Sequence, residues 1–402
     1  MFKSFFAKYI KINGFLGVFM QIINDIYYVG VNDKKVDLFE GQFIVPNGMA
    51  YNSYLIKDEK IAVLDSVGYD FGGEWLNKIE KVLDGRTPDY IIIQHMEPDH
   101  SQNVTMFTEK YKDSIVVSSQ RAFDMMKNYF GTAFEDRRLV VKEGDELSLG
   151  NHNLKFISAP MVHWPEVMVT YDEFTKTLFS ADAFGKFGAL DLEEDWACEA
   201  RRYYFGIVGK YGVQVQALLK KLTGIMVDNI CPLHGPTLTE NLGYYLDLYN
   251  TWSSYGVESD GVVIAYTSVY GNTKKAVELL QTELQNKGVK VVVNDLARCD
   301  MHEAVEDAFR YGKIVLATTT YNGDIFPFMR EFVHNLTERN FSNRFVATIE
   351  NGSWAPLADK IICTMLEKSK NLTFANSKVK IISSINEQNV EQIKSLANEL
   401  SK

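Results

Sequence analysis

Cysteine is scarce in this chain of 402 residues, which has only Cys198, Cys231, Cys299 and Cys363, with no C-x-x-C pair. This spacing excludes a thiolate zinc site or an iron–sulfur cluster and predicts four reduced thiols in a reducing cytoplasm. No apolar run reaches the roughly 18 residues that cross a bilayer, so we expect no membrane partner. The formal charge of -10 disfavours sequence-independent binding of nucleic acid.

The hydrophobic share of 46% is ordinary for a globular protein, and the length predicts two domains. Near the N-terminus, Lys3, Lys8 and Lys11 precede a short apolar stretch, as in a signal peptide. That stretch is only about seven residues long, and no small-x-small cleavage site follows it. We therefore expect residues 1–19 to be an N-terminal extension, with Met20 as an alternative start, rather than an export signal.

From Gln21 onward, short β-rich runs closed by Gly, Asn or Asp predict early antiparallel strands: IYYVGV, QFIVPNG, YNSYLI and KIAVLDSV. Helices and strands then alternate, which indicates a mixed α/β domain. The predicted helices are 71–83, 123–129, 199–222 and 239–252, and the predicted strands are 90–94, 114–118, 154–158 and 226–231.

A polar, turn-rich stretch at 252–260 separates this part from a more regular one. Five predicted strands then alternate with amphipathic helices over about 140 residues, which indicates a doubly wound parallel sheet. We place the boundary near residue 255, with domains at 20–254 and 255–402. The five strands are predicted at 262–266, 290–294, 314–318, 345–350 and 379–383.

Histidine is also scarce, with seven residues, and four of them follow predicted strands. The strand 90–94 runs into His95-Met-Glu97-Pro-Asp99-His100, which offers four candidate metal ligands in six positions. Alternate side chains of an extended segment point to one side, so His95, Glu97 and Asp99 are expected to converge.

Three more candidate ligands each follow a strand-like run: His163 in APMVHWP, Asp182 in LFSADAFG and His234 in ICPLHGP. Loops at the ends of buried strands are where rigid scaffolds place chemistry. A single histidine of this kind is usually a hydrogen-bonded core residue, but the combined pattern favours a metal site. The histidines without such settings are expected to be ordinary: His152, His302 and His334.

Seven ligands exceed what one tetrahedral ion takes, so two ions sharing a bridging carboxylate is the simplest count. Imidazoles and carboxylates without thiolate suit iron, manganese or zinc, and the share of carboxylates favours redox-capable ions. The run H-x-E-x-D-H, followed by His, Asp and His, resembles the metallo-β-lactamase fold, whose hydrolases carry His where this chain has Glu97. Glutamate at that position resembles the flavodiiron proteins (A-type flavoproteins), where both ions are iron.

This resemblance covers residues 20–402 and implies an α/β protein with an N-terminal metallo-β-lactamase-like αββα sandwich. The aromatic residues Trp164, Tyr203 and Tyr204 are also similar to the family, and they either pack in the core or shape the substrate pocket. The position of His100 is not an iron ligand in every family structure. The resemblance implies one iron on His95, Glu97 and His163, the other on Asp99, His100 and His234, and Asp182 as the bridge.

A second motif follows the strand 262–266, where Thr267-Ser-Val-Tyr-Gly-Asn-Thr273 leads into a predicted helix. Its hydroxyls, together with the backbone N–H groups of the helix N-terminus, would cradle a phosphate monoester. The pattern [TS]-x-x-[YF]-G-N-T on the first strand of a five-strand domain resembles flavodoxin, which binds the FMN phosphate there. The resemblance implies a C-terminal flavodoxin-like doubly wound parallel sheet.

Two further loops follow the third and fourth strands of this domain, at the edge where such sheets bind ligands. Their aromatic residues Tyr321 and Trp354 are candidates to stack on an isoalloxazine ring. The predicted FMN contacts are Thr267, Ser268, Val269, Tyr270, Gly271, Asn272, Thr273, Thr319, Thr320, Tyr321, Asn322, Gly323, Asp324, Asn351, Gly352, Ser353 and Trp354.

The two sites together indicate an oxidoreductase. Reduced FMN delivers two electrons and two Fe(II) another two, the four that take O2 to two waters. Two NO need two electrons to form N2O and water. A zinc hydrolase would carry His at position 97, and a non-catalytic flavodoxin-like carrier with a degenerate first domain would lack ligands, so both alternatives are disfavoured.

The family resemblance further implies a head-to-tail homodimer or a dimer of dimers, in which each flavin lies beside the partner's irons. The sequence shows no rubredoxin-type C-x-x-C module, so we expect an external donor, rubredoxin or else a deazaflavin. We expect O2 reduction in an anaerobic or microaerobic cytoplasm, with NO reduction as a competing activity.

Overall fold

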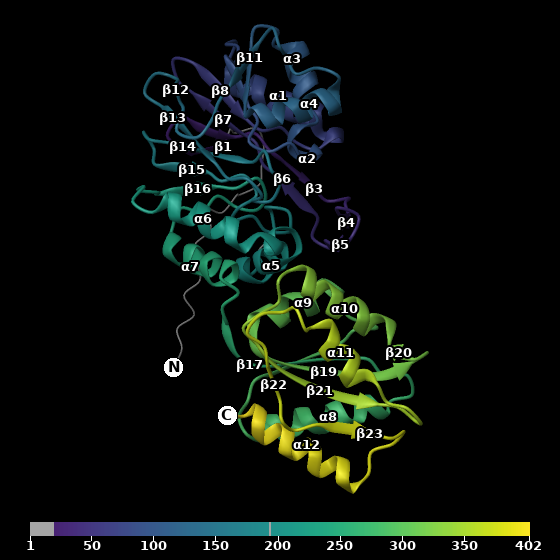
Figure 1. The fold of residues 1–402 in the computed structure, drawn as a ribbon. Coiled ribbons are helices and arrows are strands. Elements are labelled where there is room, and N and C mark those ends of the chain that lie inside the picture. The colour runs from purple at the N-terminus through teal and green to yellow at the C-terminus, as the bar shows by residue number, and fades with distance from the viewer. Residues whose placement is uncertain (1–19, 193) are drawn as a thin grey trace. The chain divides into compact units, whose positions relative to one another are not determined.

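The computed structural model describes residues 20–192 and 194–402, which form two compact units (Figure 1). The first unit contains the described residues up to Tyr203 together with Gln214–Asp247. The second contains Tyr204–Val213 and Leu248–Lys402, so a single cut of the sequence does not reproduce the division. The domain boundary near residue 255 stays a prediction, and the predicted extension at 1–19 lies outside the described residues.

The first unit contains a seven-stranded sheet in the order β1-β2-β7-β8-β9-β10-β11. Its first four strands pair antiparallel, as predicted, and the strands from β8 to β11 pair parallel. The strands are β1 (Met20–Ile23), β2 (Ile26–Tyr28), β7 (Tyr54–Lys57), β8 (Ile61–Leu64), β9 (Tyr90–Ile92), β10 (Ile115–Ser118) and β11 (Arg138–Val140).

A second sheet of five strands has the order β12-β13-β14-β15-β16, and only β15 and β16 pair parallel. Two small ladders, β3–β6 and β4–β5, complete the strands of this unit. Their bounds are β3 (Val31–Asp33), β4 (Leu38–Phe39), β5 (Phe43–Ile44), β6 (Met49–Tyr51), β12 (Glu146–Ser148), β13 (Asn153–Ser158), β14 (Met168–Asp172), β15 (Thr177–Phe179) and β16 (Asn229–Cys231).

The core of this unit lies between the two sheets. Ile56, Leu64 and Ile92 of the first sheet share one buried cluster with Phe156 and Phe179 of the second. Removing these apolar side chains from water is the main force that holds the sandwich together. Helices α1, α3 and α4 lie along the seven-stranded sheet (Figure 1). The helices are η1 (Tyr69–Phe71), α1 (Gly72–Leu83), α2 (Pro98–Ser101), α3 (Val104–Lys110) and α4 (Gln120–Phe130), together with α6 (Gly212–Leu222) and α7 (Leu242–Ser253), each of which is divided between the two units.

The helix predicted over 199–222 is interrupted in the structure. Helix α5 (Trp196–Tyr203) is followed by a π-type segment at 204–208 and a 3-10 turn at 209–211, before α6 begins at Gly212. Glycine lacks a side chain and costs about 1 kcal/mol in a helix interior. Gly206, Gly209 and Gly212 fall in this short stretch, which explains why the continuous helix fails there.

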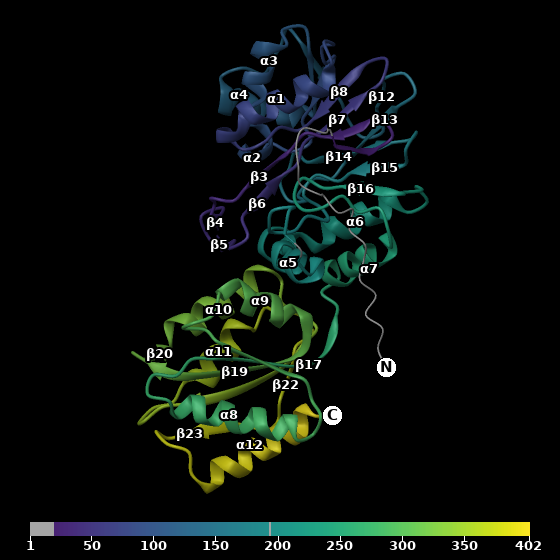
Figure 2. The same ribbon diagram turned by 180° about the vertical axis from the view of Figure 1, so that it is seen from behind.

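The second unit contains a sheet in the order β18-β17-β19-β21, with β22 and β23 both pairing with β21, and all of these pairs are parallel. This order reverses direction between β17 and β19, as doubly wound sheets do at their ligand-binding edge. The short strand β20 pairs antiparallel with β19. Helices α8 and α12 cover one face, and α9, α10 and α11 cover the other (Figures 1 and 2). The elements are β17 (Ser259–Tyr266), α8 (Asn272–Gln285), β18 (Val291–Asp295), α9 (Met301–Arg310), β19 (Tyr311–Tyr321), β20 (Asp324–Ile325), α10 (Pro327–Glu338), β21 (Phe345–Asn351), α11 (Ala358–Met365), β22 (Thr373–Phe374), β23 (Val379–Ile381) and α12 (Glu387–Leu400).

Helical spacing explains how α8 and α12 attach to the sheet. Ala276, Leu280 and Leu284 recur every four residues of α8, and all three are buried in one cluster with Ile393 and Leu396 of α12. Within the described residues, no helix is long and apolar enough to cross a bilayer. The four cysteines form no disulfide.

Candidate metal centre and flavin site

The segment after β9 carries the first four candidate ligands, but its shape differs from the prediction. The strand ends at Ile92, and helix α2 begins at Pro98, so Glu97 is the residue that precedes the helix. Asp99 and His100 therefore lie in the first turn of α2. The expectation that Asp99 continues one side of an extended segment is wrong, because proline is favoured at the first position of a helix.

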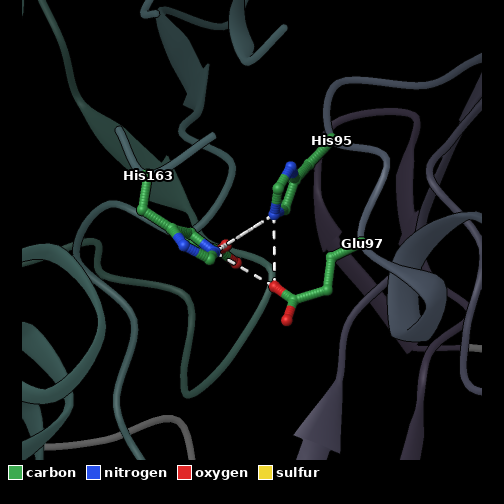
Figure 3. Close-up of side chains that lie close together, drawn as sticks. His95, Glu97 and His163 are labelled. Carbon is green, nitrogen blue, oxygen red and sulfur yellow. Dashed lines mark hydrogen bonds and ion pairs between the residues drawn. The ribbon is translucent and has the colours of Figure 1, made fainter. Parts of the chain in front are cut away.

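His95, Glu97 and His163 converge, as Figure 3 shows. The Nε2 atoms of His95 and His163 are 3.2 Å apart, and they lie 3.2 Å and 3.0 Å from Oε2 of Glu97. Oδ2 of Asp182 is 3.2 Å from Nε2 of His95 and 3.1 Å from Nε2 of His163. We call these four residues the His95 group; their ligand atoms all lie within 4.8 Å of one another.

Asp99, His100 and His234 form the second group, named here the His234 group. The Nε2 atoms of its histidines are 3.1 Å apart and lie 3.3 Å and 3.4 Å from Oδ2 of Asp99. Oδ1 of Asp182 is 3.4 Å from Nε2 of His100 and 3.6 Å from Nε2 of His234. One oxygen of Asp182 thus faces each group, which is the geometry of a bridging carboxylate.

The donor set fits two metal ions. An ion with bonds of about 2.1 Å holds neighbouring ligand atoms about 3 Å apart, as these atoms are. Both carboxylate oxygens of Asp99 and of Asp182 are buried and make no hydrogen bond. A buried carboxylate without hydrogen bonds is costly unless a cation neutralises it. The folded site therefore favours the binding of a cation.

The pKa values of two ligand histidines shift in opposite directions. Although burial opposes the shift, the carboxylates of Asp182 and Glu97, which lie 3.1 Å and 3.0 Å from its Nε2, raise the pKa of His163 to about 9. In contrast, burial and the neighbouring His100 lower the pKa of His234 to about 4. At neutral pH the His234 ring is thus uncharged and has a lone pair for a metal.

Outer partners orient two of the ligand rings. Nδ1–H of His95 donates to Oε1 of Glu166 over 2.8 Å, and the backbone N–H of Met96 donates to the same oxygen over 2.9 Å. Nδ1–H of His234 donates to the carbonyl oxygen of Ala50 over 2.7 Å. Each bond fixes the tautomer in which Nε2 faces the site, the arrangement typical of metal-binding histidines. Sequence reasoning missed Glu166, although it stands only three residues after His163.

The aromatic residues similar to the family have different neighbours. The Trp164 ring is edge-on to His95 at 5.2 Å, and the Tyr203 ring lies 5.5 Å from His234. Tyr204 packs instead against Tyr249, at 5.2 Å, in the second unit. Trp164 and Tyr203 therefore pack against ligand histidines, whereas Tyr204 is a core residue.

The three remaining histidines belong to neither group within the described part of the chain. His152 is buried, and its Nδ1 lies 2.8 Å from Oδ2 of Asp172. His302 is in the first turn of α9, and His334 is exposed on α10.

The predicted phosphate cradle lies at the N-terminus of α8. The backbone N–H groups of Gly271 and Lys274 donate to Oγ of Ser268 over 3.1 Å and 3.3 Å. Gly271 has φ of +85°, a conformation that favours glycine, and no atom lies within 4 Å of where its Cβ would be. An open, N–H-rich turn at a helix N-terminus suits a phosphate.

The other predicted flavin contacts follow β19 and β21. Strand β19 runs to Tyr321, further than predicted, because Asn322 and Gly323 form a tight turn into β20. Oγ1 of Thr319 is buried and without a hydrogen-bond partner, as expected where a ligand's polar group is missing. Tyr270 and Trp354 are 92% and 91% exposed, and so remain available to a flat ring.

The remaining predicted contacts lie on the same three strand ends. Thr267 and Thr273 are buried, and Val269 is exposed. The others are Asn272 at the start of α8, Thr320 near the end of β19, Asp324 in β20, Asn351 at the end of β21, and Gly352 and Ser353 after it.

Comparison with known proteins agrees with the fold of both units. A family model described as the ODP family β-lactamase matches residues 49–235, and a flavodoxin domain matches residues 263–370. An uncharacterised protein of Methanocaldococcus jannaschii is 30% identical over 320 residues, covering 78% of this chain and 80% of the relative. A nitric oxide reductase of Moorella thermoacetica is 29% identical and covers 87% and 90%.

Two solved structures match over both units. The rubredoxin oxygen:oxidoreductase of Desulfovibrio gigas has a TM-score of 0.88 and 25% identity, covering 96% of this chain and 98% of that one. The flavodiiron protein of Giardia intestinalis also has a TM-score of 0.88, at 23% identity, with 97% of each chain covered. The chain belongs to the flavodiiron proteins. This flavodiiron protein is an oxidoreductase that combines a β-lactamase-like fold with a flavodoxin-like one.

Proposed function

We propose that this flavodiiron protein reduces O2 to water, and NO to N2O, at a non-haem di-iron centre fed by FMN. One observation carries the proposal: seven candidate ligands in two adjoining groups, with Glu97 where hydrolases of this fold have histidine, occur in one chain with a candidate phosphate cradle of flavodoxin type. Relatives named nitric oxide reductase and rubredoxin oxygen:oxidoreductase support the same chemistry.

In this proposal His95, Glu97 and His163 hold one iron, and Asp182 bridges to the other. Asp99, His100 and His234 complete the second site. When bound, the flavin and the irons supply the four electrons that convert O2 and four protons into two waters.

The ligand side chains differ in their exposure to solvent. The side chains of Asp99 and Glu97 are 15% and 12% exposed and that of His163 is 6% exposed, whereas those of His95 and Asp182 are fully buried. Among the ligands, solvent exposure is therefore greatest at the side chains of Asp99 and Glu97, although the carboxylate oxygens of Asp99 are themselves buried. The burial of the other ligands excludes water, which strengthens the electrostatic interactions around the reacting atoms.

The direct test compares steady-state rates with O2 and with NO, using one reduced rubredoxin as donor for both gases. We expect both activities, with the larger rate for O2, in protein that contains two irons and one FMN per chain. Purified protein that contains zinc, lacks FMN and shows neither activity would refute the proposal. Rubredoxin remains the proposed donor, with a deazaflavin as the alternative to compare in the same assay.

We further propose a head-to-tail homodimer, or a dimer of two such dimers, in which electrons pass from the FMN of one chain to the irons of its partner. Two aromatic residues at the flavin loops, Tyr270 and Trp354, are more than nine-tenths exposed, which suits a surface that a protein covers. A cytoplasmic location is supported by four cysteines that form no disulfide.

Mixing two inactive variants tests the dimer. Asp182→Asn is expected to lose iron and keep FMN, and a Gly271→Asp variant, which places a carboxylate in the phosphate cradle, is expected to lose FMN and keep iron. Hybrid dimers of the two would pair one intact flavin with the partner's intact irons and regain up to half of the activity. No recovery, despite hybrid formation seen by native mass spectrometry, would show that electrons stay within one chain.

A further inference from the structure

The turn that carries His234 is held by a side chain from a distant part of the sequence. Asn52 lies between β6 and β7 and is fully buried. Its Nδ2 donates to the carbonyl oxygens of Pro232 and Gly235, over 2.8 Å and 2.7 Å. Its backbone N–H donates to the carbonyl oxygen of Leu233 over 2.8 Å. Three carbonyls of one four-residue turn, on both sides of His234, are thus bound by one asparagine.

The ring of His234 is held by the same segment. Its Nδ1–H donates to the carbonyl oxygen of Ala50, two residues before Asn52. The backbone of the turn and the ring of the ligand are therefore fixed by one short stretch, 50–52. Nε2 of His234 consequently faces His100 at 3.1 Å and Asp99 at 3.4 Å.

Asn52 has little freedom to adopt another arrangement. The carbonyl oxygens of Pro232 and Gly235 can only accept, so they fix the amide with Nδ2 toward the turn, and its Oδ1 then accepts a hydrogen bond from the hydroxyl of Tyr28 over 3.1 Å. A Cβ built on Gly30 would lie 2.8 Å from Cα of Asn52 and 2.7 Å from the Tyr28 hydroxyl, which shows how closely the chain passes there. Asparagine alone among residues of its size offers two donors toward the carbonyls and one acceptor toward a hydroxyl.

We propose that Asn52 is a positioning residue for the second iron: it sets the affinity of the His234 group by holding the His234 turn in register with Asp99 and His100. This inference rests on the proposed function, because the iron is the one assigned there. Outer-shell partners of metal ligands commonly change metal affinity by about 10–100-fold. Asn52 differs from such partners in acting on the backbone that carries the ligand.

The test measures metal binding rather than turnover. The full chain with FMN bound is freed of metal and titrated anaerobically with Co(II) alone, in competition with a chromophoric chelator. We expect the wild type to bind two ions, and Asn52→Ala to bind one of them about 10–100-fold more weakly while the other ion and the FMN content are unchanged. Asn52→Asp is expected to lose at least as much, because its carboxylate faces two carbonyl oxygens.

Three controls separate positioning from general damage. Asn389→Ala removes another buried asparagine that donates to a carbonyl, that of Lys380 in the second unit, and should leave both affinities unchanged. The absorption bands lost in Asn52→Ala should be those lost in His234→Ala, and the double variant should bind as His234→Ala does. If Asn52→Ala does not fold, Tyr28→Phe is measured in its place, and we expect about a 2–10-fold loss of affinity for the same ion.

The inference fails if Asn52→Ala and Asn52→Asp bind both ions as the wild type does, or if both ions weaken equally. It also fails if Tyr28→Phe, tested in place of an unfolded variant, binds both ions unchanged. Wild-type protein that binds fewer than two ions would instead count against the proposed function, so the two failures are distinguishable.

Discussion

Glutamine in place of Glu166 should weaken one metal site and spare the other. Oε1 of Glu166 accepts from both His95 and Met96, and its side chain is fully buried. Glutamine has nearly the same shape and can keep Oε1 as the acceptor of both bonds. The substitution therefore removes the charge while leaving the contacts in place.

The size of the effect follows from two contributions. Hydrogen bonds to a charged group contribute about 1.5–3 kcal/mol, and neutral ones about 1 kcal/mol, so each of the two bonds weakens by about 1 kcal/mol. In addition, Oε2 of Glu166 is buried without a hydrogen bond, and the NH2 group that replaces it would be an unsatisfied donor. We expect Glu166→Gln to lower affinity for the ion of the His95 group by about 10–100-fold, or about 1.4–2.7 kcal/mol.

Competition between the metal-free protein and a chelator, with Co(II) or Fe(II) as the titrant, measures the two affinities separately. Glu143→Gln is the control for removing a carboxylate elsewhere, because Glu143 also accepts a backbone N–H, that of Ser158, but is exposed, pairs with Lys221 and contacts no ligand. Wild-type affinity at both ions would refute the argument that Glu166 acts through His95. Equal losses at both ions would show that the substitution damages the fold as a whole.

Three other substitutions test separate parts of the structure. Asp182→Asn should reduce iron to less than one ion per chain with FMN unchanged, and unchanged iron would remove Asp182 from the bridge. Leu280→Ala, at a fully buried position of α8, should lower the free energy of unfolding by about 2–5 kcal/mol in urea, and a loss below about 1 kcal/mol would contradict its place in the core. The backbone N–H groups of Asn376 and Ser377 lower the pKa of Glu399 to about 2, so its carboxylate stabilises the fold above its ordinary pKa of about 4.3 and loses this effect as the pH falls toward 2. Because Glu399 is largely solvent-accessible, Glu399→Gln should cost only about 1 kcal/mol at pH 7 in thermal unfolding, and a difference that persists at pH 2 would refute the assignment.

The candidate ligands could be found from the sequence because each follows its own strand. Chemistry-bearing side chains at strand ends are recognisable locally, and the fold brings those ends together. His95 and Asp182 illustrate this, since each follows a short apolar run, and their side chains lie 3.2 Å apart. The flavin motif is equally local, because the strand, turn and helix that form it are consecutive in the chain.

Features that depend on distant pairing could not be found in the same way. Asn52 and Gly235 are 183 positions apart, and only the packing of the folded unit shows that they meet. The error at Asp99 has a different origin, because the local signal was present: Pro98 marks a helix start, and the extended pattern was carried two residues too far.

The groups that accept a hydrogen bond from the Nδ1–H of His95 and of His234 differ in charge. His95 donates to a carboxylate, whereas His234 donates to a neutral carbonyl. A hydrogen bond to a carboxylate makes an imidazole the more basic ligand, so the two irons experience different electrostatic environments even though each has histidine and carboxylate ligands. The negative charge of Glu166 stabilises the positive ion that we assign to the His95 group. The metal affinity of the His234 group depends instead on the geometry that the segment 50–52 imposes. We therefore expect Glu166→Gln, which removes a charge, to lower the metal affinity of the His95 group. We expect Asn52→Ala, which releases the His234 turn, to lower the metal affinity of the His234 group.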